Sequence, residues 1–316
     1  MNTSTATSRR VPAYVGRLAP SPTGALHLGN VRTFMIAWLR AQSQNGRLLF
    51  RMEDLDHPRD KPGAEQAAVD DLRWLGFDWD AYVRQSDRKP RYAAALAHLQ
   101  AHGHVYPCTC SRKDVEAAQS APHAGEQLHY PGTCRGRYAT WAEAAAVRPP
   151  CWRFRVPDGT TVRFDDAFAG PYEQDVAHVL GDFPICRDAH GAGYTLAVTV
   201  DDAEMGVTEV VRGDDLLPAT PAQILLYRAL GLTPPAFCHV PLVVGPDGRR
   251  LCKRHGDTRV AAYRAAGVAP DVLIGRLAQS CGWGDGSPTS LADLLPHFTL
   301  ATIPRPPCVW DVTTRL

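Results

Sequence analysis

The sequence has almost no excess of charge of either sign. Its 316 residues include 34 Lys and Arg against 33 Asp and Glu, which gives a formal net charge of +1 at neutral pH. A protein that grips nucleic acid over a large surface is normally strongly basic, so this balance argues against a dedicated nucleic-acid clamp. Any contact with RNA must therefore use a local basic patch.

Long apolar runs are also missing. No stretch approaches the roughly 20 apolar residues that a membrane-spanning helix needs, and residues 1–10 are rich in Thr and Ser without the apolar centre of a secretory leader. The nine cysteines are odd in number and form no dense disulfide framework. We therefore expect a cytoplasmic protein without membrane contact, and a flexible N-terminus over residues 1–12.

What the sequence does contain is an alternation of short apolar strands and longer amphipathic helices. The predicted strands cover residues 14–17 and 47–52, and the predicted helices cover 30–45, 62–75 and 90–102. Alternation of this kind is typical of a parallel sheet covered by helices. Residues 13–107 are therefore interpreted as the first half of an α/β domain.

The alternation stops at residue 108. Residues 108–156 are rich in Ala, Gly, Pro and His and hold three clustered cysteines, so we interpret them as an insertion into the sheet. Residues 157–257 are expected to form the second half of the domain, and residues 258–316 a mainly helical segment. Further strands are predicted over residues 151–156, 161–164 and 194–200, a helix over 221–230, and a last strand over 241–244.

The junction between the first predicted strand and helix has the composition of an anion site. It reads Arg17-Leu-Ala-Pro-Ser-Pro-Thr-Gly-Ala-Leu-His-Leu-Gly-Asn30. A helix N-terminus offers unpaired N–H groups and a partial positive charge, and glycines let phosphate approach the backbone. The alternative is that His27 only caps the helix and the glycines only turn the chain.

A second basic segment lies far downstream and reads Gly248-Arg-Arg-Leu-Cys-Lys-Arg254. Taken alone, it is typical of a solvated basic loop. Its position after an apolar strand and a Gly-Pro-Asp-Gly turn favours a functional role. Two such loops on one sheet could enclose a triphosphate from both sides.

These motifs resemble the catalytic half of the class I glutamyl-tRNA synthetases. The His-x-Gly-His and Lys-Met-Ser-Lys-Ser loops of that family read here His27-Leu-Gly-Asn30 and Arg250-Leu-Cys-Lys-Arg254. The segments Arg51-Met-Glu-Asp-Leu-Asp56 and Val211-Arg-Gly-Asp-Asp-Leu216 extend the resemblance, which runs from about residue 14 to about residue 290. It implies a Rossmann-type catalytic domain. Within the family, the sequence is similar to the short glutamyl-Q tRNA(Asp) synthetases, which lack an anticodon-binding domain.

The resemblance implies that both loops bind ATP. His27, with Gly29 and Asn30, would contact the phosphates and stabilise charge at the α-phosphorus, and Lys253 would pair with the phosphates while an adenylate forms. Arg250 stands where the family has its first lysine, and it keeps the charge with a different donor geometry. Cys252 replaces a serine and is a weaker hydrogen-bond partner.

A pocket for glutamate needs one acid for the α-ammonium and at least one arginine for carboxylate oxygens. By resemblance, Glu53 is the acid and Arg17 and Arg212 are the arginines. The same comparison adds a hydroxyl and a near wall, from Tyr194, Ala19 and Ser21. One alternative is a structural ion pair between Glu53 and Arg212. Another is glutamine as the substrate, for which a second arginine would be unnecessary.

The clustered cysteines are typical of a structural zinc site. Cys108-Thr-Cys110 and Cys134 offer three thiolates in a loop-rich segment, which suits tetrahedral Zn²⁺. His123, His129 and Tyr130 are candidates for the fourth ligand, and bare chemistry favours a histidine. The resemblance implies Tyr130 instead. One zinc ion per chain would then order the insertion, and the alternative is a set of reduced cysteines without metal.

The implied reaction is attack of the glutamate α-carboxylate on the α-phosphorus of Mg²⁺-bound ATP, which gives glutamyl-adenylate and pyrophosphate. A carboxylate is already ionised at neutral pH, so catalysis rests on alignment and charge stabilisation. Few residues follow Lys253, so we expect no anticodon-binding domain. By resemblance the acceptor is the wobble queuosine in the anticodon stem-loop of tRNA(Asp), modified by a monomeric ligase. The alternatives are charging of tRNA(Glu) at its 3′ end and a non-catalytic RNA-binding paralogue.

Overall fold

Strands and helices alternate along the chain in the computed structural model, which describes residues 14–55, 60–118, 129–188, 191–249, 251 and 257–310. The predicted flexible residues 1–12 lie outside this part. In the described ranges, no helix is both long and apolar enough for a membrane span. The strands are β1 (Val15–Leu18), β2 (Arg47–Met52), β3 (Ala81–Arg84), β4 (Val105–Cys108), β5 (Cys151–Phe154), β6 (Thr161–Asp166), β7 (Gly170–Asp175), β8 (Phe183–Cys186), β9 (Glu209–Gly213), β10 (Ala236–Val240), β11 (Val243–Val244) and β12 (Cys308–Val309).

The helices follow the strands closely in the first part of the chain. They are α1 (Leu28–Ser43), α2 (Ala64–Trp74), α3 (Lys89–Ala101), α4 (Arg112–Ala118), α5 (Trp141–Val147), α6 (Val176–Val179), α7 (Tyr194–Glu204), α8 (Thr220–Ala229), α9 (Val260–Ala265), α10 (Pro270–Gln279) and α11 (Leu291–Leu294). Short 3-10 helices are η2 (Gln85–Arg88), η3 (Asp214–Ala219), η5 (Leu295–His297) and η6 (Leu300–Thr302). The predicted helices at 30–45, 62–75, 90–102 and 221–230 are confirmed within two residues at each end.

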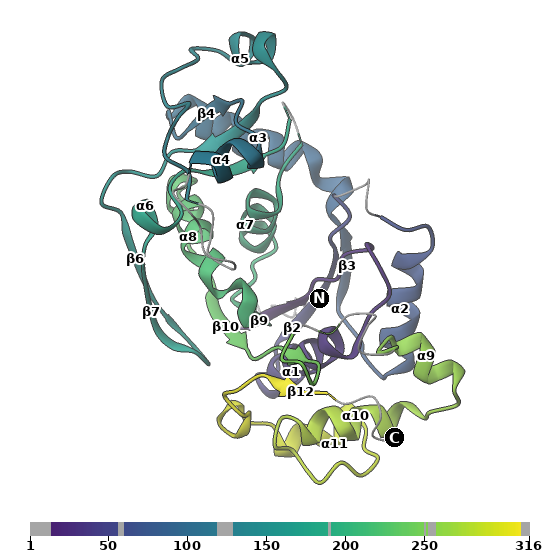
Figure 1. The fold of residues 1–316 in the computed structure, drawn as a ribbon. Coiled ribbons are helices and arrows are strands. Elements are labelled where there is room, and N and C mark those ends of the chain that lie inside the picture. The colour runs from purple at the N-terminus through teal and green to yellow at the C-terminus, as the bar shows by residue number, and fades with distance from the viewer. Residues whose placement is uncertain are drawn as a thin grey trace, which may run out of the picture.

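A layer of mainly parallel strands forms the centre of the molecule (Figure 1). One sheet has the order β1-β2-β3 with both pairs parallel, and a second has the order β7-β6-β10-β9, in which only β7 is antiparallel to its neighbour. β1 lies beside β9, because the Thr208 N–H donates to the Val15 carbonyl over 2.9 Å. Arg17 Nη1 also reaches the Val211 carbonyl at 2.8 Å. The predicted α/β class with parallel strands is therefore confirmed.

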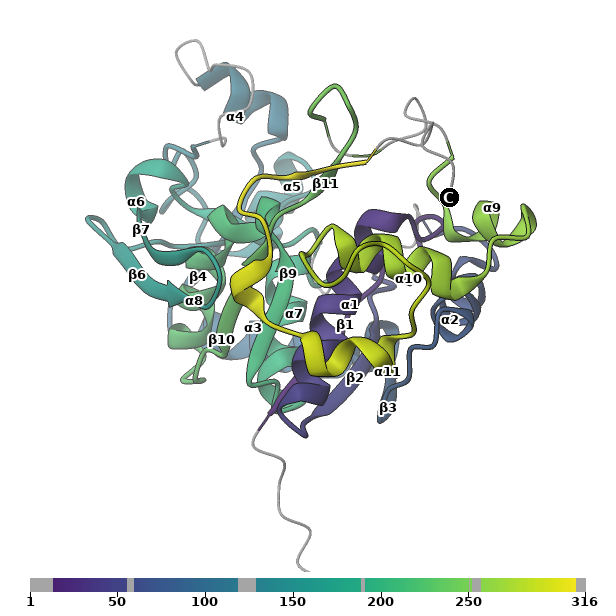
Figure 2. The ribbon, with the colours of Figure 1, turned by 90° about the horizontal axis from the view of Figure 1, so that it is seen from below.

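Helix α1 joins this layer to the last part of the chain, where α10 and α11 lie against it (Figure 2). Its Arg32 is 1% exposed and donates to Ser280 Oγ at 2.9 Å and to the Pro241 carbonyl at 2.8 Å. Apolar side chains of α1, α10 and α11 belong to one buried cluster. The mainly helical character predicted after residue 258 is confirmed for α9, α10 and α11.

A separate antiparallel sheet, in the order β4-β5-β8, stands at the opposite end from α10 and α11 (Figure 1). It carries α4 and α5 and the cysteine cluster. β5 lies inside the predicted insertion of residues 108–156, whereas β4 and β8 flank it. Between β5 and β8 the chain returns to the central layer as the hairpin of β6 and β7.

The predicted strand over residues 194–200 is wrong, because these residues open helix α7. The run Tyr-Thr-Leu-Ala-Val-Thr-Val is apolar and β-branched, which favours a strand by local preference alone. In the structure, Leu196, Ala197 and Val200 are buried in one cluster with side chains of neighbouring elements. A short apolar run buried on all sides has no periodicity to separate helix from strand, so tertiary packing decides.

Candidate functional site

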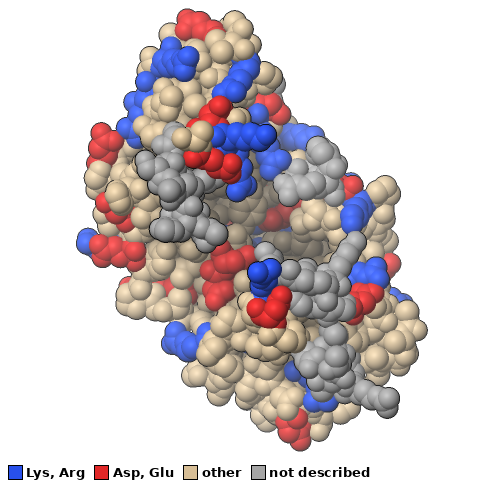
Figure 3. Space-filling model, viewed as in Figure 1, with Lys and Arg blue, Asp and Glu red and all other residues tan. Residues whose placement is uncertain are grey.

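A cavity of about 580 Å³ lies where β1, β2 and β9 end. Parallel sheets bind ligands at the carboxyl ends of their strands, because the loops that follow converge there. Predicted site residues from four separate segments line this cavity: Arg17, Ala19, Ser21, His27, Gly29, Asn30, Glu53, Tyr194 and Arg212. Arg250, Cys252 and Lys253 lie outside the described residues. The face shown in Figure 3 is hollowed at its centre, and Lys and Arg side chains gather above the hollow.

The first loop places His27 at the start of α1, in extended conformation at the N-cap position. Its backbone N–H donates to Asn30 Oδ1 over 3.4 Å, so the residue at the position of the family's second histidine helps to cap the helix. A side chain at residue 29 would place its Cβ 3.0 Å from the His27 ring. A side chain at residue 29 would therefore push the imidazole away from its position over the first turn. His27 is both the N-cap residue and part of the cavity wall.

The chain that follows the second loop runs against the first loop. The Leu28 N–H donates to the Thr258 carbonyl at 3.1 Å, and the Val260 N–H donates to the Leu26 carbonyl at 3.0 Å. His27 and Arg259 form the antiparallel bridge between them. Leu251, inside the basic loop, is buried. The hydrogen bonds bring the chain that follows the second loop, residues 258–260, to the side of the molecule that carries His27.

Glu53 follows β2 and is held by a buried arginine that the sequence reasoning did not select. Arg51 is fully buried, and it donates from Nη2 to Glu53 Oε1 at 3.1 Å and from Nη1 to Asp202 Oδ1 at 2.6 Å. Burial alone would lower the pKa of Arg51, but the carboxylates of Asp202, Glu53 and Asp201 outweigh it and raise the pKa. Burial raises the pKa of Glu53, and Arg51 and Arg17 oppose that shift. The carboxylate of Glu53 is therefore paired with a buried cation of the protein, Arg51.

The alternation of side chains along a strand predicts the contact between Arg51 and Glu53. Arg51 and Glu53 are two residues apart at the end of a strand, so their side chains share a face. The second partner of Arg51, Asp202, lies on α7, 151 residues further along the chain. Arg17 lies 3.7 Å from the same carboxylate. The pairing across elements could not be found by a local pattern.

Arg212 on β9 is 5% exposed and lines the cavity. Its Nε donates to His239 Nε2 at 2.9 Å, and its Nη2 donates to Thr220 Oγ1 and to Gln223 Oε1, both at 2.8 Å. All three acceptors are neutral oxygen or nitrogen atoms. In the described part of the chain no carboxylate pairs with this guanidinium, and the ion pair between Glu53 and Arg212 considered above is not formed.

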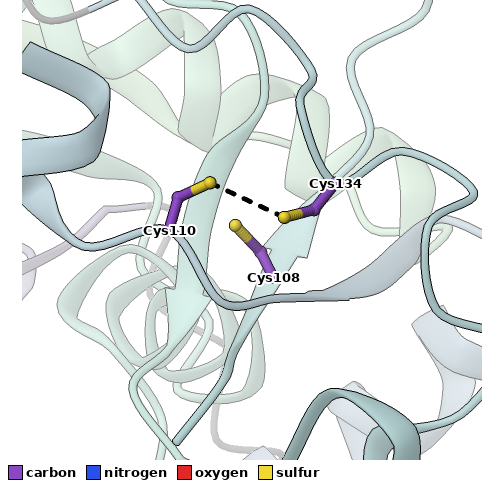
Figure 4. Close-up of side chains that lie close together, drawn as sticks. All are labelled: Cys108, Cys110 and Cys134. Carbon is purple, nitrogen blue, oxygen red and sulfur yellow. Dashed lines mark hydrogen bonds between the residues drawn. The ribbon is translucent and has the colours of Figure 1, made fainter. Parts of the chain in front are cut away.

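The cysteine cluster lies at the end of β4 and in the loop before α5 (Figure 4). The sulfur atoms of Cys108, Cys110 and Cys134 all lie within 4.8 Å of one another, and those of Cys110 and Cys134 are 3.6 Å apart. The Tyr130 hydroxyl is 3.2 Å from Cys108 Sγ and 3.6 Å from Cys110 Sγ. With metal–sulfur bonds of about 2.3 Å, a tetrahedron has edges of about 3.8 Å. The cluster could therefore hold a metal ion.

Neighbouring side chains favour the thiolate form of Cys108 in this cluster. A hydrogen bond from Cys151, on the neighbouring strand β5, lowers the pKa of the Cys108 thiol, with help from Tyr130 and Arg153. Thiolates are the form that binds metals. His129 does not belong to the group of mutually close ligand atoms, and His123 lies outside the described residues. Cys151 was not selected from the sequence, because only strand pairing brings it close.

Comparison with known proteins adds a direct result to this geometry. Residues 14–293 match the family model of the class I tRNA synthetases (E and Q), catalytic domain. The chain belongs to this synthetase family. It is 48% identical over 306 residues to a glutamyl-Q tRNA(Asp) synthetase of Symbiobacterium thermophilum, covering 92% of this chain and 94% of that protein. It is 40% identical over 302 residues to the glutamate–tRNA ligase of Aquifex aeolicus, covering 93% of this chain but 63% of that enzyme.

Solved structures agree with the family assignment. The crystal structure of a glutamate tRNA ligase from Elizabethkingia meningosepticum, in complex with its amino acid, superposes with a TM-score of 0.81 at 25% identity. The match covers 95% of this chain and 67% of that one. The resemblance drawn from the two loops is thus confirmed, and the chain is a ligase of the synthetase class. Such enzymes act on ATP, an amino acid and tRNA.

Proposed function

We propose that this protein activates L-glutamate with ATP and transfers the glutamyl group to the queuosine at the wobble position of tRNA(Asp). The carrying observation is Arg212, a buried cation with neutral protein partners at the wall of the cavity. A buried charge is unfavourable until an opposite charge joins it. The ligand that completes this site is therefore an anion, and a carboxylate can accept from Nη1, the nitrogen of Arg212 that His239, Thr220 and Gln223 do not use.

The rest of the cavity fits an acidic amino acid. Glu53 lines the same cavity, so one ligand bound there could offer an α-ammonium to Glu53 and a carboxylate to Arg212. We assign the α-ammonium to Glu53 and the carboxylate oxygens to Arg17 and Arg212, with Tyr194, Ala19 and Ser21 as further contacts. Glutamine would leave the charge of Arg212 without a counter-ion. The charge balance thus favours glutamate over glutamine.

We assign ATP to the two loops beside this pocket. His27, Gly29 and Asn30 would hold the phosphates at the start of α1, where the helix dipole attracts anions. The hydrogen bonds of residues 26–28 with residues 258–260 support a position of Arg250 and Lys253 on the same phosphates. Mg²⁺ would enter with ATP. In this scheme His27 and Lys253 are the catalytic residues, because they would meet the charge that develops at the α-phosphorus.

We assign a structural zinc ion to Cys108, Cys110, Cys134 and Tyr130. Their distances match a tetrahedral set, and three of the four side chains are at most 3% exposed. With all four positions occupied by protein, no position stays open for a substrate. The zinc would tie β4 to the loop before α5. Residues 108–156 then form a zinc-binding subdomain between residues 13–107 and 157–257 of the catalytic domain, followed by the helical residues 258–316.

The acceptor is proposed from the relatives. The chain covers 94% of the glutamyl-Q tRNA(Asp) synthetase named above but only 63% of the glutamate–tRNA ligase. The similarity to the glutamyl-Q tRNA(Asp) synthetase therefore extends over nearly the whole of that protein. We therefore propose the anticodon stem-loop of tRNA(Asp) as the RNA partner of a monomeric enzyme. ATP and tRNA are cytoplasmic, which fits the compartment expected from the sequence.

A labelling experiment tests this function. The enzyme is incubated with ATP, radiolabelled glutamate and tRNA purified from cells that make queuosine, and in parallel with tRNA from cells that cannot. We expect label on tRNA(Asp) only in the first case. Label on tRNA(Glu) in both cases would instead identify a tRNA(Glu)-charging enzyme. Absence of glutamate-dependent ATP–pyrophosphate exchange without RNA would refute activation of glutamate altogether.

A further inference from the structure

A buried hydrogen-bond chain stands behind Arg212, on the side away from the cavity. His239 on β10 is the register partner of Arg212 on β9, and it is 1% exposed. Arg212 Nε donates to His239 Nε2 at 2.9 Å, so that nitrogen must carry a lone pair. The imidazole proton then sits on Nδ1, which lies 2.6 Å from Asp166 Oδ2. The chain runs from a carboxylate through a neutral imidazole to a guanidinium.

Asp166 holds the histidine in this tautomer. Besides the imidazole, its carboxylate accepts the backbone N–H groups of His239 at 3.0 Å, Phe168 at 3.0 Å and Ala169 at 2.8 Å. Burial alone would raise the pKa of Asp166, but these hydrogen bonds outweigh it and lower the pKa. An ionised carboxylate can only accept, which requires the proton of His239 to be on Nδ1. Burial lowers the pKa of His239, which keeps the imidazole neutral at neutral pH.

A neutral intermediary has a consequence that a direct ion pair would not have. If Asp166 touched Arg212, as Asp202 touches Arg51 at 2.6 Å, the guanidinium would be neutralised inside the protein. With His239 between them, the arginine is oriented while its charge stays available to a ligand. Thr220 and Gln223 complete this neutral shell on Nη2. The neutral shell makes Arg212 different from Arg51: Arg51 is paired with carboxylates of the protein, whereas Arg212 can pair with a carboxylate of the ligand.

We propose that His239, held by Asp166, is a positioning residue that orients Arg212 and makes the pocket select a carboxylate side chain over a carboxamide. The inference rests on the proposed glutamate pocket and goes further, because it assigns the selection to a residue that need not touch the substrate. It predicts that the acceptor atom at the position of Nε2 matters more than the bond to Asp166.

Two amide variants separate these contacts. In His239→Gln the amide oxygen can occupy the position of Nε2 and accept from Arg212. In His239→Asn the shorter amide can reach Asp166 but not Arg212. A hydrogen bond to a charged donor supports an expected rise of about ten- to a hundredfold in the KM for glutamate in His239→Asn. We expect the preference for glutamate over glutamine to fall with it, and His239→Gln to stay within a few-fold of the wild type.

The assay is ATP–pyrophosphate exchange with purified full-length enzyme, measured at varied glutamate, glutamine and ATP. The KM for ATP and the thermal melting temperature serve as controls, because a damaged fold would change both. A His239→Asn variant with wild-type glutamate KM and selectivity would overturn the inference. So would an equal rise in the KM for glutamate and for ATP, or equal defects in both variants. If the wild type itself shows no glutamate-dependent exchange, the proposed function fails first, and the inference falls with it.

Discussion

Replacing Arg212 by methionine tests the charge of the pocket directly. Methionine fills a similar space with an apolar, flexible side chain, so it removes the guanidinium without opening a large cavity. The two N–H groups on Nη1 of Arg212, which His239, Thr220 and Gln223 leave unused, would make up to two charge-assisted hydrogen bonds to the side-chain carboxylate of glutamate. Each is worth about 1.5–3 kcal/mol. Their loss predicts a decrease of about 10²- to 10⁴-fold in kcat/KM for glutamate activation, at 1.36 kcal/mol for each factor of ten.

The fold should tolerate this change. The variant leaves acceptors on His239, Thr220 and Gln223 without their donor, which costs about 1–3 kcal/mol for each group that stays dry. It also removes a buried charge that no carboxylate among the described residues compensates, which is favourable in the absence of ligand. We therefore expect opposing effects and a melting temperature that changes by only a few degrees.

The measurement is ATP–pyrophosphate exchange over a range of glutamate and glutamine concentrations. Arg212→Lys is the matched control, because it keeps the charge but not the planar fork, and it should lie between the wild type and Arg212→Met. The residual activity of Arg212→Met should no longer distinguish glutamate from glutamine. A well-folded Arg212→Met enzyme within threefold of wild-type kcat/KM would refute the assigned pocket.

Two further predictions concern the same cavity, and a third concerns the cysteine cluster. Gly29→Ala places a Cβ 3.0 Å from the His27 ring and should displace the imidazole. We therefore expect kcat to fall by about ten- to a hundredfold, with little change in the KM for glutamate. An unchanged kcat would contradict the catalytic role of His27. Burial raises the pKa of Glu53, so on acidification this carboxylate loses its charge at a pH above the ordinary pKa of about 4.3. The KM for glutamate should therefore rise as the pH falls. In Glu53→Gln the KM for glutamate should be high and independent of pH. Purified protein should contain one zinc ion per chain by atomic emission, and Cys110→Ser should lower that content and destabilise the β4-β5-β8 sheet; a metal-free protein of unchanged stability would rule the zinc site out.

The first loop of the site was accessible from local sequence because its parts lie close together along the chain. The loop from Arg17 to Asn30 contains the glycines, the histidine and the helix start, and all of them are local requirements of one strand–helix junction. Arg17, Glu53 and Arg212 were assigned by the resemblance to the synthetase family, and the structure brings all three to one cavity. Parallel strands explain this convergence, since their carboxyl ends share one edge.

Other features depended on packing between distant segments. The segment 194–204 became a helix because it is buried on several sides, whereas its β-branched residues alone favoured a strand. At the cysteine cluster, β4 pairs with β5 and brings Cys151 beside Cys108, and the fold leaves His129 outside the group that Tyr130 joins.

The sequence by itself determined the fold class, the family and the residues that carry charge at the strand ends, because short periodic patterns and contiguous loops encode them. The tertiary structure alone decided how those charges are balanced. Arg51 is paired with Asp202 and Glu53, whereas Arg212 is surrounded by neutral acceptors. The physical reason is that burial and counter-ions are set by packing between separate elements. Asp202 reaches Arg51 from 151 residues away, and the neutral partners of Arg212 come from α8 and β10. No local pattern records that Arg212 keeps its charge available while Arg51 does not.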